Sequence, residues 1–240
     1  MLDEVLAGLF PAGHMIEREP HGIVSGTGRL EHIGEVALVG IVDGTPLGNE
    51  GALALAAHVL AIVERGDRLP IVVLVDTSSQ NMSRRDELLG LNEYLGHLSK
   101  CLAFAGTQGH RTVSVLYGQA AAGAFITTAL STLDLAALPG AEPFVMDLPS
   151  ISRVTKLPLD QLKEMAKSTP IFAPRLDPLF ATGAVAEKWD ANSLSKQLIA
   201  LLQRTAGFSD QRDQTGLERG GRKQAAAIAK RVKDEAANHA

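Results

Sequence analysis

Two apolar, β-branched runs separated by a helical stretch constrain the fold more than any other feature of this sequence. The runs are Ile71–Asp76 (IVVLVD) and Thr112–Tyr117 (TVSVLY). Neither shows a regular polar alternation, which is typical of strands covered on both faces in a parallel sheet. Between them, leucines recur at spacings of three and four from Leu88 to Ala105, which predicts one long helix from about Ser83. Strand, crossover helix and strand in series predict an α/β domain with right-handed βαβ connections.

Further elements are expected on both sides of this unit. Residues 22–42 hold two β-rich runs around a polar turn and predict a hairpin, and the Ala/Leu-rich residues 49–65 predict a buried helix. The sequence PFVMD predicts a short strand, and three helical segments are expected at 159–167, 175–184 and 192–206. The chain is therefore expected to comprise one domain over residues 1–206 and a charged helical tail over residues 207–240.

Composition excludes several classes of function. The 240 residues carry 23 Lys+Arg against 27 Asp+Glu, so no basic excess predicts a nucleic-acid partner. A single cysteine, Cys101, excludes an internal disulfide and a zinc site built on several thiolates, and fits a reducing cytoplasm. The first ten residues carry acids where a signal peptide carries bases, and no apolar run is long enough for a membrane span. We expect a cytoplasmic protein without a membrane partner or a metal.

The stretch VSVLYGQAAAGAFITTAL, residues 113–130, is a strand-to-helix turn without an acid, a base or a nucleophile. The first N–H groups of a helix lack intrahelical partners, and small side chains let a ligand atom approach them closely. Such a turn can stabilise negative charge on a substrate oxygen, which is the role of an oxyanion hole. Taken alone, the turn favours the simpler interpretation that small residues let the helix pack closely on the sheet.

Other motifs do not fit this turn. A Walker loop needs Gly-Lys-Ser/Thr, whereas Gly123 is followed by Ala124 and Phe125. A dinucleotide-binding fingerprint would need a third glycine, and a hydrolase nucleophile elbow would need a serine between glycines. Nucleotide binding of these kinds and acyl-enzyme chemistry from this loop are excluded.

Five segments together resemble the carboxyltransferase branch of the crotonase superfamily over most of residues 20–190. They are VSGTGRLEHIGEVALVGIVDG, PIVVLVDTSSQ, YGQAAAGAFITTAL, PFVMDLPSISRV and APRLDPLFATGAVAEKWD. The pattern is similar to the α-type carboxyltransferase subunit of acetyl-CoA carboxylase. It is closer to the malonate decarboxylase γ subunits, on VDTSSQNMSRRDELLGLNEYL and the alanine-rich turn. The resemblance implies an α/β, crotonase/ClpP-like core of ββα units with C-terminal helices.

The resemblance also implies a reaction, namely decarboxylation of a malonyl thioester through an enolate held by an oxyanion hole. The main-chain amides of Gly123 and Ala124 are its expected donors, and the expected substrate-binding residues are Ala121, Ala122, Gln119, Ser78, Ser79 and Gln80. Alanines stand where the carboxylase has mostly glycine and serine, and Gln119 replaces an acid. This departure favours a relative that no longer carries out biotin chemistry.

The partners implied by the resemblance are a homologous β subunit in a heterodimer, an acyl-carrier subunit and an acyltransferase subunit. The chain itself is expected to bind no cofactor, because the carrier subunit bears a CoA-like prosthetic group. Two alternatives stay open: a biotin-dependent carboxyltransferase or decarboxylase subunit, and a scaffold subunit without catalysis.

Five other side chains receive structural interpretations. His97 and Cys101, one helical turn apart beside the leucine stripe, are expected in the core rather than as a catalytic pair. His58 is expected to be a hydrogen-bonded core or interface histidine. Asp76 is expected to cap the amides of the loop that follows it, and Arg175 to pair with an acid or a helix terminus.

Overall fold

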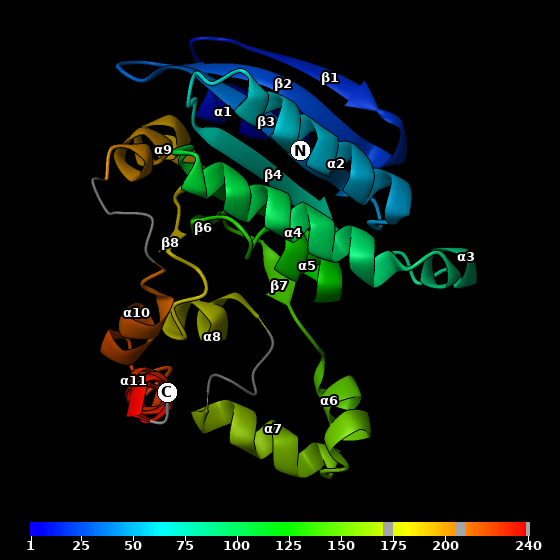
Figure 1. Ribbon diagram of the computed structural model, residues 1–240, viewed down its shortest axis with the longest axis vertical. Coiled ribbons are helices and arrows are strands. Elements are labelled where there is room, and N and C mark those ends of the chain that lie inside the picture. The colour runs from blue at the N-terminus through cyan, green and yellow to red at the C-terminus, as the bar shows by residue number, and fades with distance from the viewer. Residues whose placement is uncertain (170–174, 205–209, 239–240) are drawn as a thin grey trace. The chain divides into compact units, whose positions relative to one another are not determined.

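The computed structural model describes residues 1–169, 175–204 and 210–238, and it divides into two compact units (Figure 1). The first unit comprises Met1–Val145 with Glu187–Phe208, and the second comprises Met146–Ala186 with Ser209–Ala240. Two expected features lie outside the described residues. They are the domain boundary between residues 206 and 207 and the start of the Ala-Pro-Arg-Leu segment at residues 173 and 174.

The described residues of the first unit form an eight-stranded sheet. Its order is β1 (His14–Glu19), β2 (Ile23–Leu30), β3 (Gly34–Gly44), β4 (Ile71–Thr77), β5 (Thr112–Ala121), β6 (Asp134–Ala137) and β8 (Glu187–Lys188), while β7 (Glu142–Phe144) also pairs with β5. The first three strands are antiparallel, and from β3 onward every pairing is parallel. The predicted hairpin and the predicted parallel β4–β5 pair are both confirmed.

Helices cover both faces of this sheet. On one side α2 (Asn49–Glu64), α4 (Leu91–Thr107) and α5 (Ala122–Thr128) lie side by side (Figure 1). On the other side α1 (Leu2–Leu9) and α9 (Leu194–Leu202) share one hydrophobic cluster with Leu74 of β4 and Val115 of β5. The 3-10 turns η1 (Pro20–Gly22) and η3 (Ala191–Ser193) complete the connections. Burial on both faces explains why the central strands are apolar at nearly every position.

The predicted long helix from Ser83 to Ala105 is wrong in one respect, because it is two helices. The first, α3 (Arg84–Leu88), is capped by the Ser83 hydroxyl, which accepts from the Asp86 amide at 3.1 Å. Gly90 then takes a left-handed conformation at φ 87° and ends that turn before α4 begins. As a result Leu88, which fits the leucine stripe by spacing, is 75% exposed.

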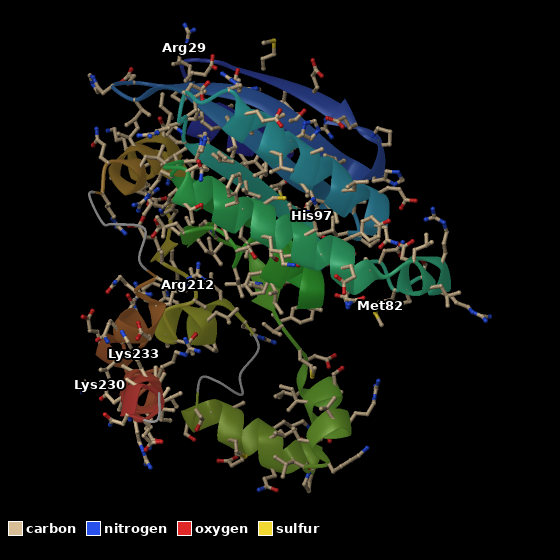
Figure 2. All side chains as sticks on the ribbon, in the orientation of Figure 1. Arg29, Met82, His97, Arg212, Lys230 and Lys233 are labelled. Atoms are coloured by element: carbon tan, nitrogen blue, oxygen red, sulfur yellow. The ribbon has the colours of Figure 1, made fainter. Side chains whose placement is uncertain are left out.

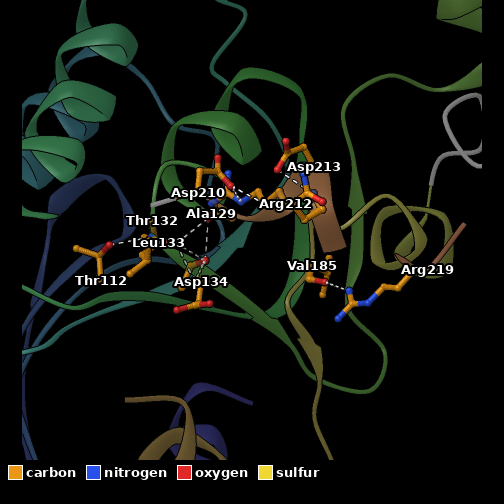
Figure 3. Close-up of polar contacts among 12 residues, drawn as sticks. Thr112, Ala129, Thr132, Leu133, Asp134, Val185, Asp210, Arg212, Asp213 and Arg219 are labelled. Atoms are coloured by element: carbon orange, nitrogen blue, oxygen red, sulfur yellow. Dashed lines mark hydrogen bonds and ion pairs between the residues drawn. The ribbon is translucent and has the colours of Figure 1, made fainter. Parts of the chain in front are cut away.

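In the first unit, the sequence reasoning missed α1, β1, β6 and β8. A buried stripe of Leu2, Val5, Leu6 and Leu9 at spacings of three and four was the available signal for α1. The β6 strand has only four residues, and side-chain hydrogen bonds hold the connection from α5 into it (Figure 3). The Thr112 hydroxyl accepts from the Leu133 amide, and the Thr132 hydroxyl donates to the Asp134 carbonyl, both at 2.9 Å. Such a short strand depends on tertiary pairing rather than on its own sequence pattern.

The second unit is helical: α6 (Leu148–Thr155), α7 (Leu159–Ser168), α8 (Leu176–Ala181), α10 (Arg212–Glu218) and α11 (Ala225–Asn238). Within this unit the Arg219 guanidinium donates to the carbonyls of Phe180, Val185 and Ala186 and lies 3.7 Å from the Phe180 ring centroid. Figure 3 shows the contact with Val185. The last helix, α11, carries the exposed Lys230 and Lys233 (Figure 2). In the described part of the chain, the helices are all too short or too polar to cross a bilayer.

Candidate functional site

Two loops meet at the carboxyl edge of the central strands. Strands β4 and β5 are parallel neighbours, and Thr77 near the end of β4 is paired with Ala120 near the end of β5. The loop after β4 and the turn after β5 therefore leave the sheet side by side. This edge is where open parallel sheets bind their ligands.

The closest contact between the two loops joins Gln80 to Gly123. The Gly123 main-chain N–H donates to Oε1 of Gln80 at 2.8 Å. Gly123 lies in the first turn of α5, where its amide has no intrahelical acceptor, and the N-cap residue, Ala121, has no side-chain oxygen that could cap the helix. Gln80 therefore supplies the cap across 43 residues of sequence. The Gly123 amide, which was expected to face a substrate oxygen, therefore already donates to an oxygen of the same chain.

Main-chain hydrogen bonds join the loop after β4 to the loop after β3. The amide of Leu47 donates to the Ser79 carbonyl at 2.9 Å, and the amide of Asn81 donates to the Leu47 carbonyl at 2.8 Å. Leu47 and Gln80 thus form an isolated parallel bridge. The Thr77 hydroxyl adds a donor to the Thr45 carbonyl at 2.7 Å. The main chain on both sides of Gln80 is held by strand-like hydrogen bonds.

A buried carboxylate anchors the far end of the same loop. Asp86 is only 2% exposed, and its Oδ2 accepts from Nδ2 of Asn81 at 2.9 Å. Nδ2 of Asn49 donates to the Asp86 main-chain carbonyl at 3.2 Å, and a side chain at Gly48 would stand 2.5 Å from the same carboxylate oxygen. Sequence reasoning missed Leu47, Asn81 and Asp86 as positioning residues. Only Asp86 had carried a signal, as the acid that follows Ser83 by three residues.

The alanines of the turn divide by exposure. Ala122 and Gly123 are half-buried, whereas Ala121 and Ala124 are covered by the chain's own atoms, Ala124 completely. Ala121 is paired with Phe144 of β7. Ala122 takes φ 51°, a left-handed conformation that is strained for any residue with a side chain, which turns the main chain sharply from strand to helix. Of the four, Ala122 and Gly123 can be reached from outside this chain.

The remaining predicted site residues, Ser78, Ser79, Gln80 and Gln119, do not all lie in one place. Ser78 is exposed, and Ser79 is half-buried with its hydroxyl donating to the Gln80 carbonyl at 2.8 Å. These two residues lie with Gln80 at the carboxyl edge. Gln119 lies elsewhere, because it lines a pocket of about 510 Å³ beside α1. The structure thus brings Gln80, Ser79, Ala122 and Gly123 together and leaves Gln119 apart.

Asp76 lines the same pocket as Gln119, and its hydrogen bond corrects an expectation. Its Oδ1 accepts from the Gln119 amide at 3.1 Å, so it holds the end of the next strand rather than capping its own loop. Tyr117 lines the same pocket at 4% exposure, and its buried hydroxyl finds no hydrogen-bond partner among the described residues. Burial, and then the nearby Asp76 and Asp43 carboxylates, raise the pKa of Tyr117 far above its ordinary value. The phenol is neutral at physiological pH.

The histidines and the cysteine differ partly from expectation. Cys101 is buried, and this burial raises the pKa of its thiol. His97 is exposed on α4 (Figure 2), and its Nε2 lies 3.6 Å from Sγ of Cys101. The expectation of a buried His97 is wrong, because α4 turns that side chain away from the sheet. His58 is hydrogen-bonded as expected, with Nε2 2.7 Å from Oε1 of Glu19. No group of His, Cys, Asp and Glu within the described ranges could hold a metal ion.

Comparison with known proteins adds evidence independent of this geometry. A family model described as "Malonate decarboxylase gamma subunit" matches residues 42–236. The chain is 32% identical to a malonyl-S-ACP:biotin-protein carboxyltransferase of Malonomonas rubra over 157 residues, and this alignment covers 63% of the chain. The chain spans about half the length of that relative, 53%.

Solved structures agree on the fold. A Pseudomonas malonate decarboxylase hetero-tetramer in complex with coenzyme A contains a chain that is similar with a TM-score of 0.82, at 20% identity and with 97% and 98% of the two chains covered. The MdcD–MdcE hetero-dimer of a Pseudomonas malonate decarboxylase gives a TM-score of 0.76 at 21% identity, with 97% of each chain covered. The transcarboxylase 12S core matches with a TM-score of 0.68 at 15% identity, over 84% of this chain and 39% of that one. The crotonase-like carboxyltransferase fold expected from the sequence is confirmed.

Proposed function

The chain belongs to the family of malonate decarboxylase gamma subunits, and from this membership we propose that it is a subunit of a biotin-independent malonate decarboxylase. In this proposal the complex converts a malonyl thioester on an acyl-carrier subunit into the acetyl thioester and CO2. One observation carries the proposal. The family match covers residues 42–236, and so includes both loops that meet at Gln80 and Gly123.

The chemistry suits a site without a protein nucleophile. When the bond between the α-carbon and the carboxylate breaks, its electron pair passes into the enolate of the acetyl thioester, and a proton is then added to the α-carbon. Catalysis requires hydrogen-bond donors at the thioester oxygen that bind the enolate more strongly than the ground state. In this proposal the donors come from amides at the carboxyl edge of β4 and β5.

Within this proposal, the amides of Gly123 and Ala124 are the oxyanion donors, and Ala121, Ala122, Gln119, Ser78, Ser79 and Gln80 face the substrate. The exposure of Ser78 and the half-burial of Ala122 and Gly123 support their part in it. The complete burial of Ala124 and the position of Gln119 in a separate pocket weigh against theirs. Gly123 can hold an enolate oxygen only if Oε1 of Gln80 leaves its amide.

The proposed partners are a homologous beta subunit, an acyl-carrier subunit with a CoA-like prosthetic group and an acyltransferase subunit. The structurally similar Pseudomonas proteins, a hetero-dimer and a hetero-tetramer in complex with coenzyme A, support the first partner and a CoA-like thioester. In this assembly the beta subunit contributes the opposite wall of the site.

A biotin-dependent carboxyltransferase is the second candidate, because the Malonomonas rubra relative is named for transfer to a biotin protein. The alanine-rich turn supports the biotin-independent proposal instead, since carboxylases resembling this chain carry mostly glycine and serine there. A scaffold without catalysis is the third candidate.

The test is CO2 release from a malonyl thioester by the chain purified from its native cells with the partners it retains, with and without avidin. Release that avidin leaves unchanged is the expected result. Release that avidin blocks would favour the biotin-dependent candidate. An intact heteromeric complex that releases no CO2 would contradict the proposal and favour the scaffold.

A further inference from the structure

We propose that the pocket beside α1 binds a small organic cation, held between the Asp76 carboxylate and the Tyr117 hydroxyl. The ligand class is an alkylammonium or alkylguanidinium group on a short apolar body. The pocket has a volume of about 510 Å³, within the usual range for small-molecule sites, and every residue that lines it belongs to the first unit. Neither Gln80 nor Gly123 lines it, so binding there is independent of the proposed decarboxylation.

The alternation of side chains along β4 and β5 places this pocket on the α1 side of the sheet. Leu74 and Val115 pack in the hydrophobic cluster that α1 and α9 share with the sheet. Successive side chains of a strand point to opposite faces, so residues two apart share a face. Asp76 follows Leu74 by two residues, and Tyr117 follows Val115 by two residues. Both side chains therefore reach the pocket from the face opposite α5, at the carboxyl edge where parallel sheets bind ligands.

The Tyr117 hydroxyl is a buried polar group for which the described part of the chain supplies no partner. Tyr117 is 4% exposed and lines the pocket, and its hydroxyl oxygen makes no hydrogen bond with any described residue. Burial raises the pKa of Tyr117, so the phenol stays neutral and can both donate and accept a hydrogen bond. Buried polar groups in proteins nearly always have a partner. The hydroxyl therefore points to a polar group that enters from the pocket.

Asp76 supplies a fixed negative charge beside that hydroxyl. Its Oδ1 accepts from the Gln119 amide at 3.1 Å, which orients the carboxylate, and its Oδ2 has no partner among the described residues. Asp76 is half-buried, so salt screens an ion pair there less than on an open surface. Glu4 and Glu142 add two exposed carboxylates, and the lining residues include no Lys, Arg or His. The amino group of Met1, which also lines the pocket, lies 3.7 Å from Oε2 of Glu4. The charges of the lining therefore favour a cation.

Apolar side chains form much of the remaining wall. Val5 of α1, Leu138 after β6 and Leu194 at the start of α9 line the pocket, and all three are buried. Apolar walls with a few fixed polar groups are the usual lining of a small-molecule site. The described residues hold no cluster of side chains suited to a metal ion. A ligand with one cationic end and a short hydrocarbon body matches both parts of the lining.

The test is an NMR titration of the full chain with four small probes. The reporter is the Gln119 amide, because it donates to Asp76 and senses a change at that carboxylate. The probes n-butylammonium and n-butylguanidinium carry the proposed charge, whereas n-butanol and butyrate have a similar body without it. We expect saturable shifts with at least one of the two cations. Butanol and butyrate should bind at least about 10-fold more weakly, because a hydrogen bond to a charged group contributes about that factor or more.

Two variants locate the bound cation, and a third is the matched control. Asp76→Asn keeps an oxygen that can accept from the Gln119 amide but removes the charge, and should weaken cation binding by about 10-fold or more. Tyr117→Phe keeps the ring and should weaken it by about 3- to 10-fold, the effect of one neutral hydrogen bond. Glu31→Gln removes a carboxylate from the exposed turn between β2 and β3, at the opposite edge of the sheet, and should bind like wild type. Circular dichroism checks that each variant is folded.

The absence of a saturable shift with both cations, or equally tight binding of butanol or butyrate, would overturn the proposal. Wild-type affinity in Asp76→Asn or in Tyr117→Phe would also overturn it. Repeating the titration on the chain assembled with its partner subunits identifies the source of the cation. Binding that persists in the assembly indicates a free molecule, and binding that is lost on assembly indicates a cationic side chain of a partner subunit. The CO2-release assay tests the proposed function separately from either result.

Discussion

Replacing Tyr117 with phenylalanine should stabilise this protein, although it removes a polar atom from the centre of the sheet. The Tyr117 side chain packs in the cluster formed by α1, α9 and the sheet, and its hydroxyl is buried without a hydrogen-bond partner in the described residues. A buried polar group without a partner costs about 1–3 kcal/mol of folding free energy. Phenylalanine keeps the ring and its packing and removes that cost.

We take the lower end of this range, about 1 kcal/mol, because the hydroxyl lies beside an open pocket. For a chain of this length, the gain corresponds to a rise in Tm of about 2–4 °C. Thermal and urea unfolding of the purified chain, followed by circular dichroism, measure both quantities. Ser114→Ala is the matched control, because the buried Ser114 hydroxyl donates to the Ala129 carbonyl at 2.8 Å. That variant should lose about 1–2 kcal/mol.

The pH dependence gives a second check on Tyr117. Because burial raises its pKa in the folded state, the folded chain resists ionisation of the phenol. This contribution to stability is complete below the unfolded pKa of about 10 and is lost as the pH rises above it. Tyr117→Phe should lack that alkaline loss and keep a constant advantage near neutral pH. A Tyr117→Phe chain that is equally stable or less stable would refute the reasoning, since the hydroxyl would then have a partner.

Three further results are expected. In urea unfolding, Gly118→Ala should lower the free energy of unfolding by about 1–3 kcal/mol, because the added Cβ would stand 2.2 Å from Oδ1 of Asp76. Gly96→Ala, inside α4 with no described atom within 4 Å of the added Cβ, should raise it by about 0.5–1 kcal/mol. Equal effects of the two variants would contradict the packing argument. Because burial raises the pKa of the Cys101 thiol, it should react with a disulfide reagent at least about 10-fold more slowly in the native chain than in denaturant. The reaction should become faster as the pH rises, whereas fast reaction at neutral pH would indicate an activated thiolate. The Asp147 carboxylate accepts from the Ser150 amide at 2.8 Å, and hydrogen bonds from the Ser150 side chain and then from its amide lower the pKa of that carboxyl from the ordinary 3.8. The cap of α6 should therefore persist at neutral pH and weaken as the pH falls below that value, and an NMR titration of the Ser150 amide showing no shift would exclude the cap.

Much of the fold could be predicted from local patterns because those patterns record burial. The runs at Ile71–Thr77 and Thr112–Ala121 are apolar on both faces, which is a direct consequence of helices on both sides of a parallel sheet. Where local pattern and geometry diverged, the prediction failed. Leucine spacing runs through Gly90 without interruption, but the left-handed conformation of Gly90 divides the helix. The strand β6 is too short to carry a pattern of its own.

The candidate site shows the same division. From the sequence by itself, the small residues of the β5–α5 turn and the polar loop after β4 could be assigned to one edge of the sheet, because parallel strands end together. Only the tertiary structure decided that Gln80 caps Gly123, that Asp86 fixes the Gln80 loop and that Gln119 lines a pocket beside α1. The contact between Gln80 and Gly123 joins segments 43 residues apart, and no periodicity along the chain encodes a distance across it.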